Sequence, residues 1–192
     1  MNRPMRHKPE SILAAALSVF FDEGVNVSTA RIATAAGVSN GTLFNYFPTK
    51  QALIDALYVS IKSDLADAAG KLDDTDSIEQ RMRQIWDRWF TWAREHRQAH
   101  FVVNLLHQAG LASHEAQLAG TAALAGPVRV LDDAMQSGLL VDLPLDYLGP
   151  LIQHHLDQAI ASELDDRQSE IAFHVLWNGI TQKTTAARNS TK

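Results

Sequence analysis

Apolar residues recur every three to four positions along most of the chain, which is the spacing of one face of an α-helix. In residues 11–23, for example, Leu13, Leu17 and Phe20 share such a face. Gly24 then ends the segment. The pattern predicts helices at residues 11–23, 29–36, 40–47, 50–69, 77–96, 98–108, 113–137, 146–163 and 166–187. No strand-like alternation of apolar and polar residues interrupts it, so the sequence predicts an all-α protein.

Capping residues and prolines refine these boundaries. Asp76 and Glu79 have the spacing of a capping box and are expected to begin the helix that follows them. Pro127 should kink the 113–137 segment or divide it into two helices, because proline lacks an amide hydrogen. Pro150 is tolerable only near a helix start. The polar tail, residues 184–192, is expected to fray.

Composition excludes several classes of function. Of the 192 residues, 46% are hydrophobic and 20% are charged, which is typical of a soluble globular protein. The sequence has no cysteine, so disulfides, zinc–thiolate sites, iron–sulfur clusters and thiol catalysis are excluded. No apolar run approaches the roughly 20 residues that a membrane span requires. We therefore expect a cytoplasmic protein with no cofactor and no membrane partner.

Charge is distributed unevenly along the chain. The formal net charge of −5 argues against a protein that coats nucleic acid non-specifically. Residues 1–50 nevertheless carry five Lys and Arg side chains against three acidic ones, whereas the remainder carries 12 against 19. A slightly basic head on an acidic body suggests two parts with different partners. Arg3, Arg6 and Lys8 are either an arm that reaches a DNA minor groove or a solvated tail.

The most informative segment, residues 28–50, predicts a helix–turn–helix. Ser28 and Ser39 are each placed to cap a short helix, and Gly37 can supply the positive φ that ends the first one. Ala33 is small where the two helices must cross closely, and Val38 is expected to plug the space between them. The segment is therefore explained by steric requirements.

Short or planar hydrogen-bonding groups remain on the outer side of the second helix. Asn40 and Gly41 stand at its N-terminus, where such helices contact bases in the DNA major groove. Glycine has a poor helix propensity, which is understandable where the backbone must approach DNA closely. Thr29 begins the first helix and is placed for a phosphate, as is Lys50, which opens the next long helix.

In these residues the chain resembles the TetR family of transcriptional regulators. The resemblance runs from about Lys8 to Leu57 and includes the runs Phe20–Gly24, Ala36–Ser39 and Gly41–Phe44. It implies a three-helix DNA-binding domain, residues 1–48, followed by a larger helical ligand-binding and dimerisation domain, residues 49–188. It also implies DNA contacts from Thr29, Ser39, Asn40, Gly41, Thr42, Asn45, Tyr46 and Lys50. Asn40 departs from the Lys or Arg of many relatives, which leaves one phosphate or guanine contact open.

Aromatic residues crowd into residues 86–101, and two interpretations remain open. They are either ordinary core or the wall of a ligand cavity in which polar neighbours orient the ligand. The candidate ligand-binding residues are Trp89, Phe101 and His107. Such a site predicts an unidentified small-molecule effector of apolar or aromatic character.

The last two predicted helices carry broad apolar stripes. One helix–turn–helix reads only a few base pairs, and the usual solution is a two-fold dimer on a palindrome. We therefore expect a homodimer, and the resemblance implies that these helices form its interface. The candidate interface residues are Leu156, Ile160, Phe173 and Trp177.

Taken together, the sequence predicts a ligand-responsive DNA-binding transcriptional regulator. We expect a repressor that binds a palindromic operator and is released by its effector, with residues 50–69 transmitting the change. No phosphate loop, nucleophile elbow or carboxylate pair supports an enzyme. The histidine spacings favour no metal site, since Gly110 breaks the helical path between His107 and His114. The alternative is a helical ligand-binding or adaptor protein whose helix–turn–helix is non-functional.

Overall fold

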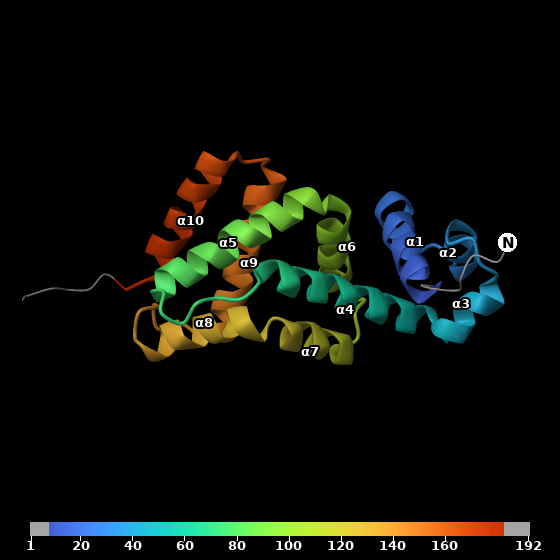
Figure 1. Cartoon of the computed structure of the whole chain (residues 1–192), viewed down its shortest axis with the longest axis horizontal. Coiled ribbons are helices and arrows are strands. Elements are labelled where there is room, and N and C mark those ends of the chain that lie inside the picture. The colour runs from blue at the N-terminus through green and yellow to red at the C-terminus, as the bar shows by residue number, and fades with distance from the viewer. Residues whose placement is uncertain (1–7, 183–192) are drawn as a thin grey trace, which may run out of the picture. The chain divides into compact units, whose positions relative to one another are not determined.

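The computed structural model describes residues 8–182 of the chain. Within this range the chain forms ten helices and no strand (Figure 1). The helices are α1 (Lys8–Glu23), α2 (Thr29–Ala35), α3 (Asn40–Tyr46), α4 (Lys50–Ala69), α5 (Ile78–Glu95), α6 (Arg97–Gln108), α7 (His114–Ala123), α8 (Ala125–Gln136), α9 (Leu145–Ala161) and α10 (Asp166–Ile180). The all-α prediction is confirmed. None of the helices in residues 8–182 is long and apolar enough to span a membrane.

The start of α5 differs from the prediction by one residue. Ser77, not Asp76, is the cap, because Ser77 Oγ accepts a hydrogen bond from Gln80 N at 3.2 Å. Gln80 Oε1 in turn accepts from Ser77 N at 2.8 Å, which completes a capping box. Asp76 instead accepts a hydrogen bond from Gln84 Nε2. A serine hydroxyl and an aspartate carboxylate cap equally well, so sequence alone could not choose between the adjacent residues.

The remaining boundary predictions have different outcomes. The segment with Pro127 is divided as expected, and Leu124 separates α7 from α8. Pro150 lies in the second turn of α9, further inside the helix than expected. The prediction that the last helix reaches residue 187 is wrong, since α10 ends at Ile180. Thr181 instead forms an isolated antiparallel bridge with Leu140. The expected frayed tail, residues 184–192, lies outside the described residues, as do Arg3 and Arg6.

The described chain divides into two compact units. Unit 1 contains residues up to 67 and residues 95–124, which include α1 to α3, most of α4, α6 and α7. Unit 2 contains residues 68–94 and the chain from 125 onward, which include α5, α8, α9 and α10. Helices α6 and α7 thus group with the helix–turn–helix, although the sequence-based division falls at residue 48. The assignment of functions to the two sequence segments stays a prediction.

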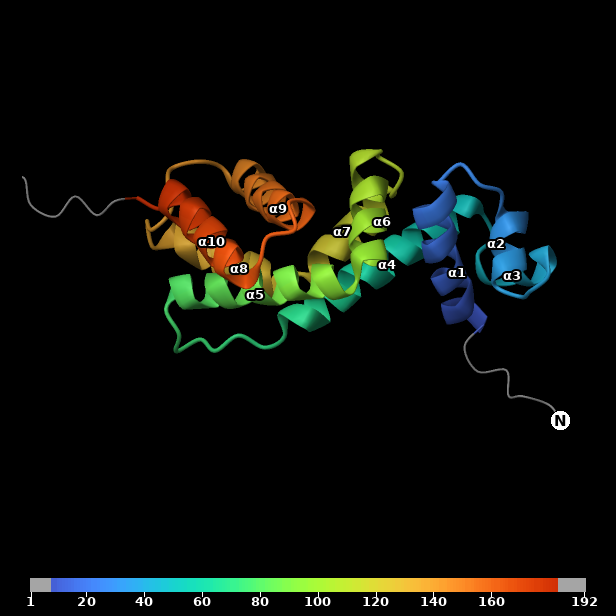
Figure 2. The same cartoon turned by 90° about the horizontal axis from the view of Figure 1, so that it is seen from above.

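Each unit has its own apolar core. In unit 1, Phe20 of α1, Leu53 of α4 and Leu106 of α6 are fully buried. The core of unit 2 is contributed by α5, α8, α9 and α10, and it includes Trp86, Leu148 and Phe173. Within that unit α9 and α10 lie side by side (Figure 1 and Figure 2). A ligand cavity or a DNA surface can therefore be sought within each unit separately.

Candidate nucleic-acid interface

Two capped helices and a tight turn build the helix–turn–helix. Ser28 Oγ accepts a hydrogen bond from Arg31 N at 3.2 Å, and Ser39 Oγ accepts one from Thr42 N at 3.1 Å. Gly37 has a φ of +67°, which an L side chain rarely adopts, so glycine is required to end α2 at this point. Val38 N then donates to Ala33 O at 3.0 Å. Both serine caps and the glycine turn agree with the sequence prediction.

The inner side of this motif is a small apolar core. Ile32 and Leu43 are fully buried, Ala33 and Phe47 are nearly so, and Val38 is half-buried. Because these residues fix α3 against the rest of unit 1, the opposite side of α3 faces solvent. The backbone N–H groups of its first turn that no cap satisfies are available to a bound anion.

Four predicted contact residues form the outward face of α3. These residues are Asn40, Gly41, Asn45 and Tyr46, and all are exposed. A Cβ on Gly41 would meet only Ser39 Oγ, at 3.9 Å, so packing within the chain does not require glycine there. Glycine also costs helix stability of about 1 kcal/mol relative to alanine. Contacts within the chain therefore do not explain the glycine, and the expectation that the backbone of α3 approaches DNA closely here stays a prediction.

Two other predicted contacts are engaged within the chain. Thr42 is half-buried, and its hydroxyl shares a hydrogen bond of 2.9 Å with Ser39 Oγ, so both side chains stabilise the start of α3. Lys50 Nζ donates to Val25 O at 2.6 Å and to Val27 O at 2.7 Å. Two of its three N–H donors therefore fix the loop that precedes α2, and its phosphate contact stays a prediction.

The cations near the helix–turn–helix are paired within the chain. Arg31 Nη2 lies 2.6 Å from Glu23 Oε1, and both side chains are partly exposed. Thr29 is half-buried at the first position of α2. Positions 9–50 contain two Lys and Arg residues, Arg31 and Lys50. Both side chains already have partners inside the chain.

Comparison with known proteins identifies this motif. Residues 12–57 match the family model described as bacterial regulatory proteins, tetR family. The chain has a TetR-family N-terminal segment and a TetR-like fold. A solved structure of a TetR-family transcription regulator from Marinobacter aquaeolei is similar over 92% of this chain and 96% of that chain, with 23% identity and a TM-score of 0.80. One from Haemophilus influenzae is similar over 91% and 97%, with 21% identity and a TM-score of 0.72.

The TetR-like fold separates the three predicted ligand-binding residues. Trp89 lines an apolar cavity of unit 2. Phe101 belongs to unit 1, where its ring packs edge-on against Phe21 at 5.4 Å. His107 also belongs to unit 1, and its Nδ1 lies 3.5 Å from the hydroxyl of Tyr58. Trp89 thus lines a cavity, whereas the ligand-binding roles of Phe101 and His107 stay predictions.

The four predicted interface residues lie in or against the core of unit 2. Leu156, Phe173 and Trp177 are buried in the core of unit 2, and Ile160 packs against that core. Most of their apolar surface is already covered within one chain, and their part in a dimer interface stays a prediction. The exposed apolar side chains on the same two helices are Tyr147, Leu151, Ile171 and Val175.

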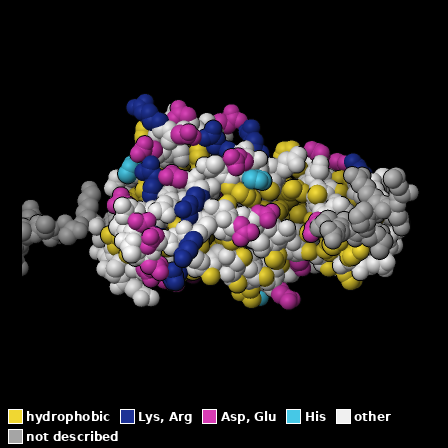
Figure 3. Space-filling view, viewed as in Figure 1, with side chains coloured by type: hydrophobic (Ala, Val, Ile, Leu, Met, Phe, Trp, Pro, Cys, Tyr) yellow, Lys and Arg dark blue, Asp and Glu magenta, His cyan; other side chains and the backbone are white. Residues whose placement is uncertain are grey.

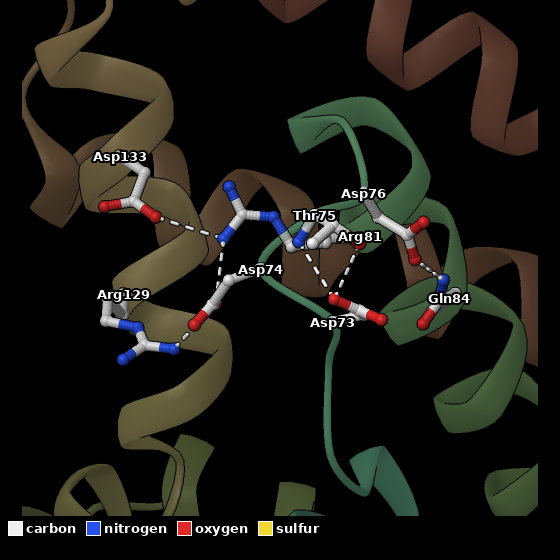
Figure 4. Close-up of polar contacts among 8 residues, drawn as sticks. All are labelled: Asp73, Asp74, Thr75, Asp76, Arg81, Gln84, Arg129 and Asp133. Atoms are coloured by element: carbon white, nitrogen blue, oxygen red, sulfur yellow. Dashed lines mark hydrogen bonds and ion pairs between the residues drawn. The ribbon is translucent and has the colours of Figure 1, made fainter.

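Sequence reasoning missed a charged cluster at the start of α5 (Figure 4). Arg81 is only 7% exposed, and its Nη1 lies 3.1 Å from Asp133 of α8 and 3.8 Å from Asp74 in the loop before α5. Arg129 of α8 also pairs with Asp74, at 3.1 Å. The pKa of Asp73 is lowered because its carboxylate accepts hydrogen bonds from the backbone and hydroxyl of Thr75. The acidic run before α5 was visible in the sequence, but its partner on α8 was not.

Proposed function

We propose that this chain is a DNA-binding transcriptional regulator that recognises a double-stranded operator through α3 and acts in the cytoplasm, where that DNA lies. The outward face of α3 carries the proposal, because its amide and phenol groups are exposed while Leu43 on the opposite side is buried. Asparagine can bond two atoms of an adenine edge in the major groove, and such contacts specify sequence. Ser39 and Thr42 fix the start of α3, and Lys50 holds the loop that precedes α2. Together with Thr29 they offer donors to phosphates.

Selection of bound duplexes from a random library tests this proposal. The selected operator should bind the full chain far more tightly than random duplex in a fluorescence anisotropy titration. Asn45→Ala should reduce the preference for the operator by about 1–3 kcal/mol, because one base contact is lost. Asn178→Ala is the matched control, since Asn178 is an exposed asparagine on α10. If selection enriches no sequence above the random pool, the regulator proposal fails and the adaptor alternative remains.

We also propose that the regulator binds its operator as a homodimer. A single α3 reads only a few base pairs, and a two-fold dimer doubles the site on a palindrome. Tyr147 and Leu151 of α9 lie one turn apart, as do Ile171 and Val175 of α10, and all four are exposed. An apolar pair on each of two neighbouring helices supports a surface that a second copy covers.

We further propose that the protein is a repressor and that a small molecule bound in unit 2 releases it from DNA. Met82 and Ile85 of α5 line the cavity of that unit. Arg88, also on α5, donates to the carbonyl of Ala69 at the end of α4 and to Lys71 O at 3.3 Å. Helix α4 continues from Ala69 back to Lys50, which holds the loop before α2. A ligand that moves α5 can thus act on α4 through Arg88.

Exchange of Arg88 tests this connection. An effector is first found by screening compounds for release of the chain from its selected operator. Arg88→Met should leave the affinities for effector alone and for DNA alone unchanged, but reduce the effect of one on the other. That effect is expected to be 5- to 150-fold in the unchanged protein. Arg167→Met, at an exposed position of α10, is the control. Equal coupling in both variants would exclude Arg88 as the connection.

A further inference from the structure

Unit 2 contains an apolar cavity that is lined by residues of its four helices α5, α8, α9 and α10. The cavity is about 40 Å³, which exceeds the space that one water molecule needs. Its lining residues are Met82, Ile85, Trp86, Trp89, Pro127, Leu131, Ile152, Leu156, Phe173, Leu176, Trp177 and Ile180. Apolar cavities of this kind stay dry and accept apolar guests, because water finds no hydrogen-bond partners in them.

The polar groups of this lining are few. Among the lining side chains, the only N–H or O–H donors are the indole N–H groups of three tryptophans. That of Trp86 is already donated to the buried Ser169 Oγ at 2.9 Å. His155 lies against the Trp86 ring, and its Nε2 lies 2.9 Å from Ala172 O. A charged group inside the cavity would lose its hydration and gain no counter-ion, which is strongly unfavourable.

The cavity and a hollow on the surface share one lining side chain. Phe173 of α10 lines both spaces, together with Ser77, Glu79, Gln80, Arg83 and Gln84 on the outer side. The Phe173 ring stacks on Trp177 at 6.0 Å inside, and the Arg83 guanidinium lies 5.1 Å from its centroid. This ring is therefore the contact that the cavity and the hollow have in common.

At the hollow, the charged groups are the Arg83 guanidinium, its two carboxylate partners and Glu79. Arg83 pairs with Asp87 and with Glu170, each at 3.1 Å. Burial lowers the pKa of Arg83, but these two carboxylates outweigh that effect and raise the pKa above its ordinary value. The guanidinium therefore stays protonated, and its positive charge is balanced by its two partners. Glu79 adds another carboxylate to the lining of the hollow. Positive and negative side chains are likewise interspersed over this unit in Figure 3. A ligand carboxylate would meet an acidic excess at this entrance.

We infer that this cavity binds an uncharged apolar molecule, which enters past Phe173, and that the acidic entrance rejects carboxylates. The inference rests on the proposed function, because it names the chemical class of the effector. A cavity of this size is too small for most effectors, so binding displaces the Phe173 ring toward the hollow. Any polar end of the ligand then remains in the hollow beside Gln80 and Gln84, while its apolar body replaces the ring.

Three eight-carbon probes of different charge test this chemistry. Octan-1-ol, octanoate and octylammonium have the same eight-carbon chain. None of them absorbs light at the wavelengths that excite tryptophan. Three of the four tryptophans, Trp86, Trp89 and Trp177, line the cavity, so intrinsic fluorescence of the full chain reports its filling. Octan-1-ol should bind with one molecule per chain and at least tenfold more tightly than either ion. Equal or tighter binding of octanoate or octylammonium, or no binding of octan-1-ol, would overturn the inference.

Two opposite changes at Leu131 locate the site. Leu131 is half-buried on α8 and lines the cavity. Leu131→Phe should fill the cavity and weaken octan-1-ol binding at least tenfold, whereas Leu131→Ala should strengthen it. Leu118→Ala, at an exposed leucine of α7, should change nothing. If Leu131→Phe does not fold, Leu131→Ala alone tests the location. An unchanged affinity of Leu131→Ala for octan-1-ol would then refute binding in this cavity.

Further variants test the entrance. Phe173→Leu should accelerate both association and dissociation of octan-1-ol in stopped-flow fluorescence, and unchanged rates would exclude the Phe173 route. Arg83→Gln should leave the octan-1-ol affinity within twofold of the unchanged chain; a tenfold loss would mean that the guanidinium holds the ligand. All these measurements omit DNA. A chain that binds octan-1-ol but no operator therefore refutes only the regulator proposal, and the converse refutes only the inferred ligand.

Discussion

The salt dependence of operator binding follows from the cations of the helix–turn–helix. Affinity falls with salt because each Lys or Arg that neutralises a phosphate releases counterions from DNA. Positions 9–50 contain two such residues, Arg31 and Lys50. Arg3, Arg6 and Lys8 precede them, and the sequence left open whether they form an arm or a solvated tail. The perturbation is a triple variant in which these three residues are changed to alanine.

The expected slopes can be worked out from these counts. The logarithm of affinity changes with the logarithm of salt by about −0.9 for each neutralised phosphate. Arg31 and Lys50 from two protomers then give a slope no steeper than about −4. Participation of all five cations from each protomer would give about −9. Between 50 and 200 mM salt, affinity would fall about 250-fold in the first case and more than about 10⁵-fold in the second.

Anisotropy titrations of the selected operator at several salt concentrations measure both slopes. We expect the unchanged chain and the triple variant to share a slope near −4 or shallower, because the tail is then solvated. Arg167→Ala, remote from the motif in sequence and in unit 2, is the control for loss of positive charge. A steep slope that the triple variant abolishes would establish the arm. A slope steeper than about −5 in the triple variant would mean that cations other than Arg31 and Lys50 also neutralise phosphates, which would refute this reasoning.

Three further predictions concern association and stability. Val175→Asp places a charge at a side chain that is 61% exposed, so it should produce a folded monomer by light scattering, whereas Asn178→Asp should remain dimeric. Asp133→Asn should lower the free energy of unfolding in urea by about 1–3 kcal/mol, because it leaves Arg81 buried beside a distant partner. Asp74→Asn should cost less than about 1 kcal/mol, since Asp74 is 72% exposed and 3.8 Å away. Burial, followed by the charge of Asp67, raises the pKa of Asp64 in the folded state, so its ionised form destabilises the fold; Asp64→Asn should raise the melting temperature at pH 7, and the gain should shrink as the pH falls toward 4.

The local part of this fold was predictable because local rules decide it. Ser28, Gly37 and Ser39 each have one energetically favourable role at their position, and the spacing between them fixes a two-helix motif. The cap of α5 was missed by one residue because Asp76 and Ser77 satisfy the same rule. Local rules therefore specify an element while leaving its first residue open.

The candidate ligand site could not be predicted because it depends on packing between distant segments. Trp89, Phe101 and His107 lie close in sequence, but the chain passes from unit 2 into unit 1 between the first two. Nothing in their spacing indicates this division. Phe173 was predicted from its helical stripe as an interface residue, and only the folded structure shows that it lines a cavity and contacts Trp86 and Arg83. Long-range contacts of this kind require the folded structure.

The electrostatics of the motif favour sequence-dependent binding over general attraction to DNA. Arg31 and Lys50 already have partners in Glu23 and in two loop carbonyls, and the whole chain has a net charge of −5. Both features weaken the phosphate attraction that is common to every DNA sequence. Under the proposed function, the remaining affinity comes from hydrogen bonds and close contact along the outward face of α3, and a DNA sequence other than the operator does not match these contacts. A wide gap between operator and random DNA is therefore the expected consequence of a motif with so few available cations.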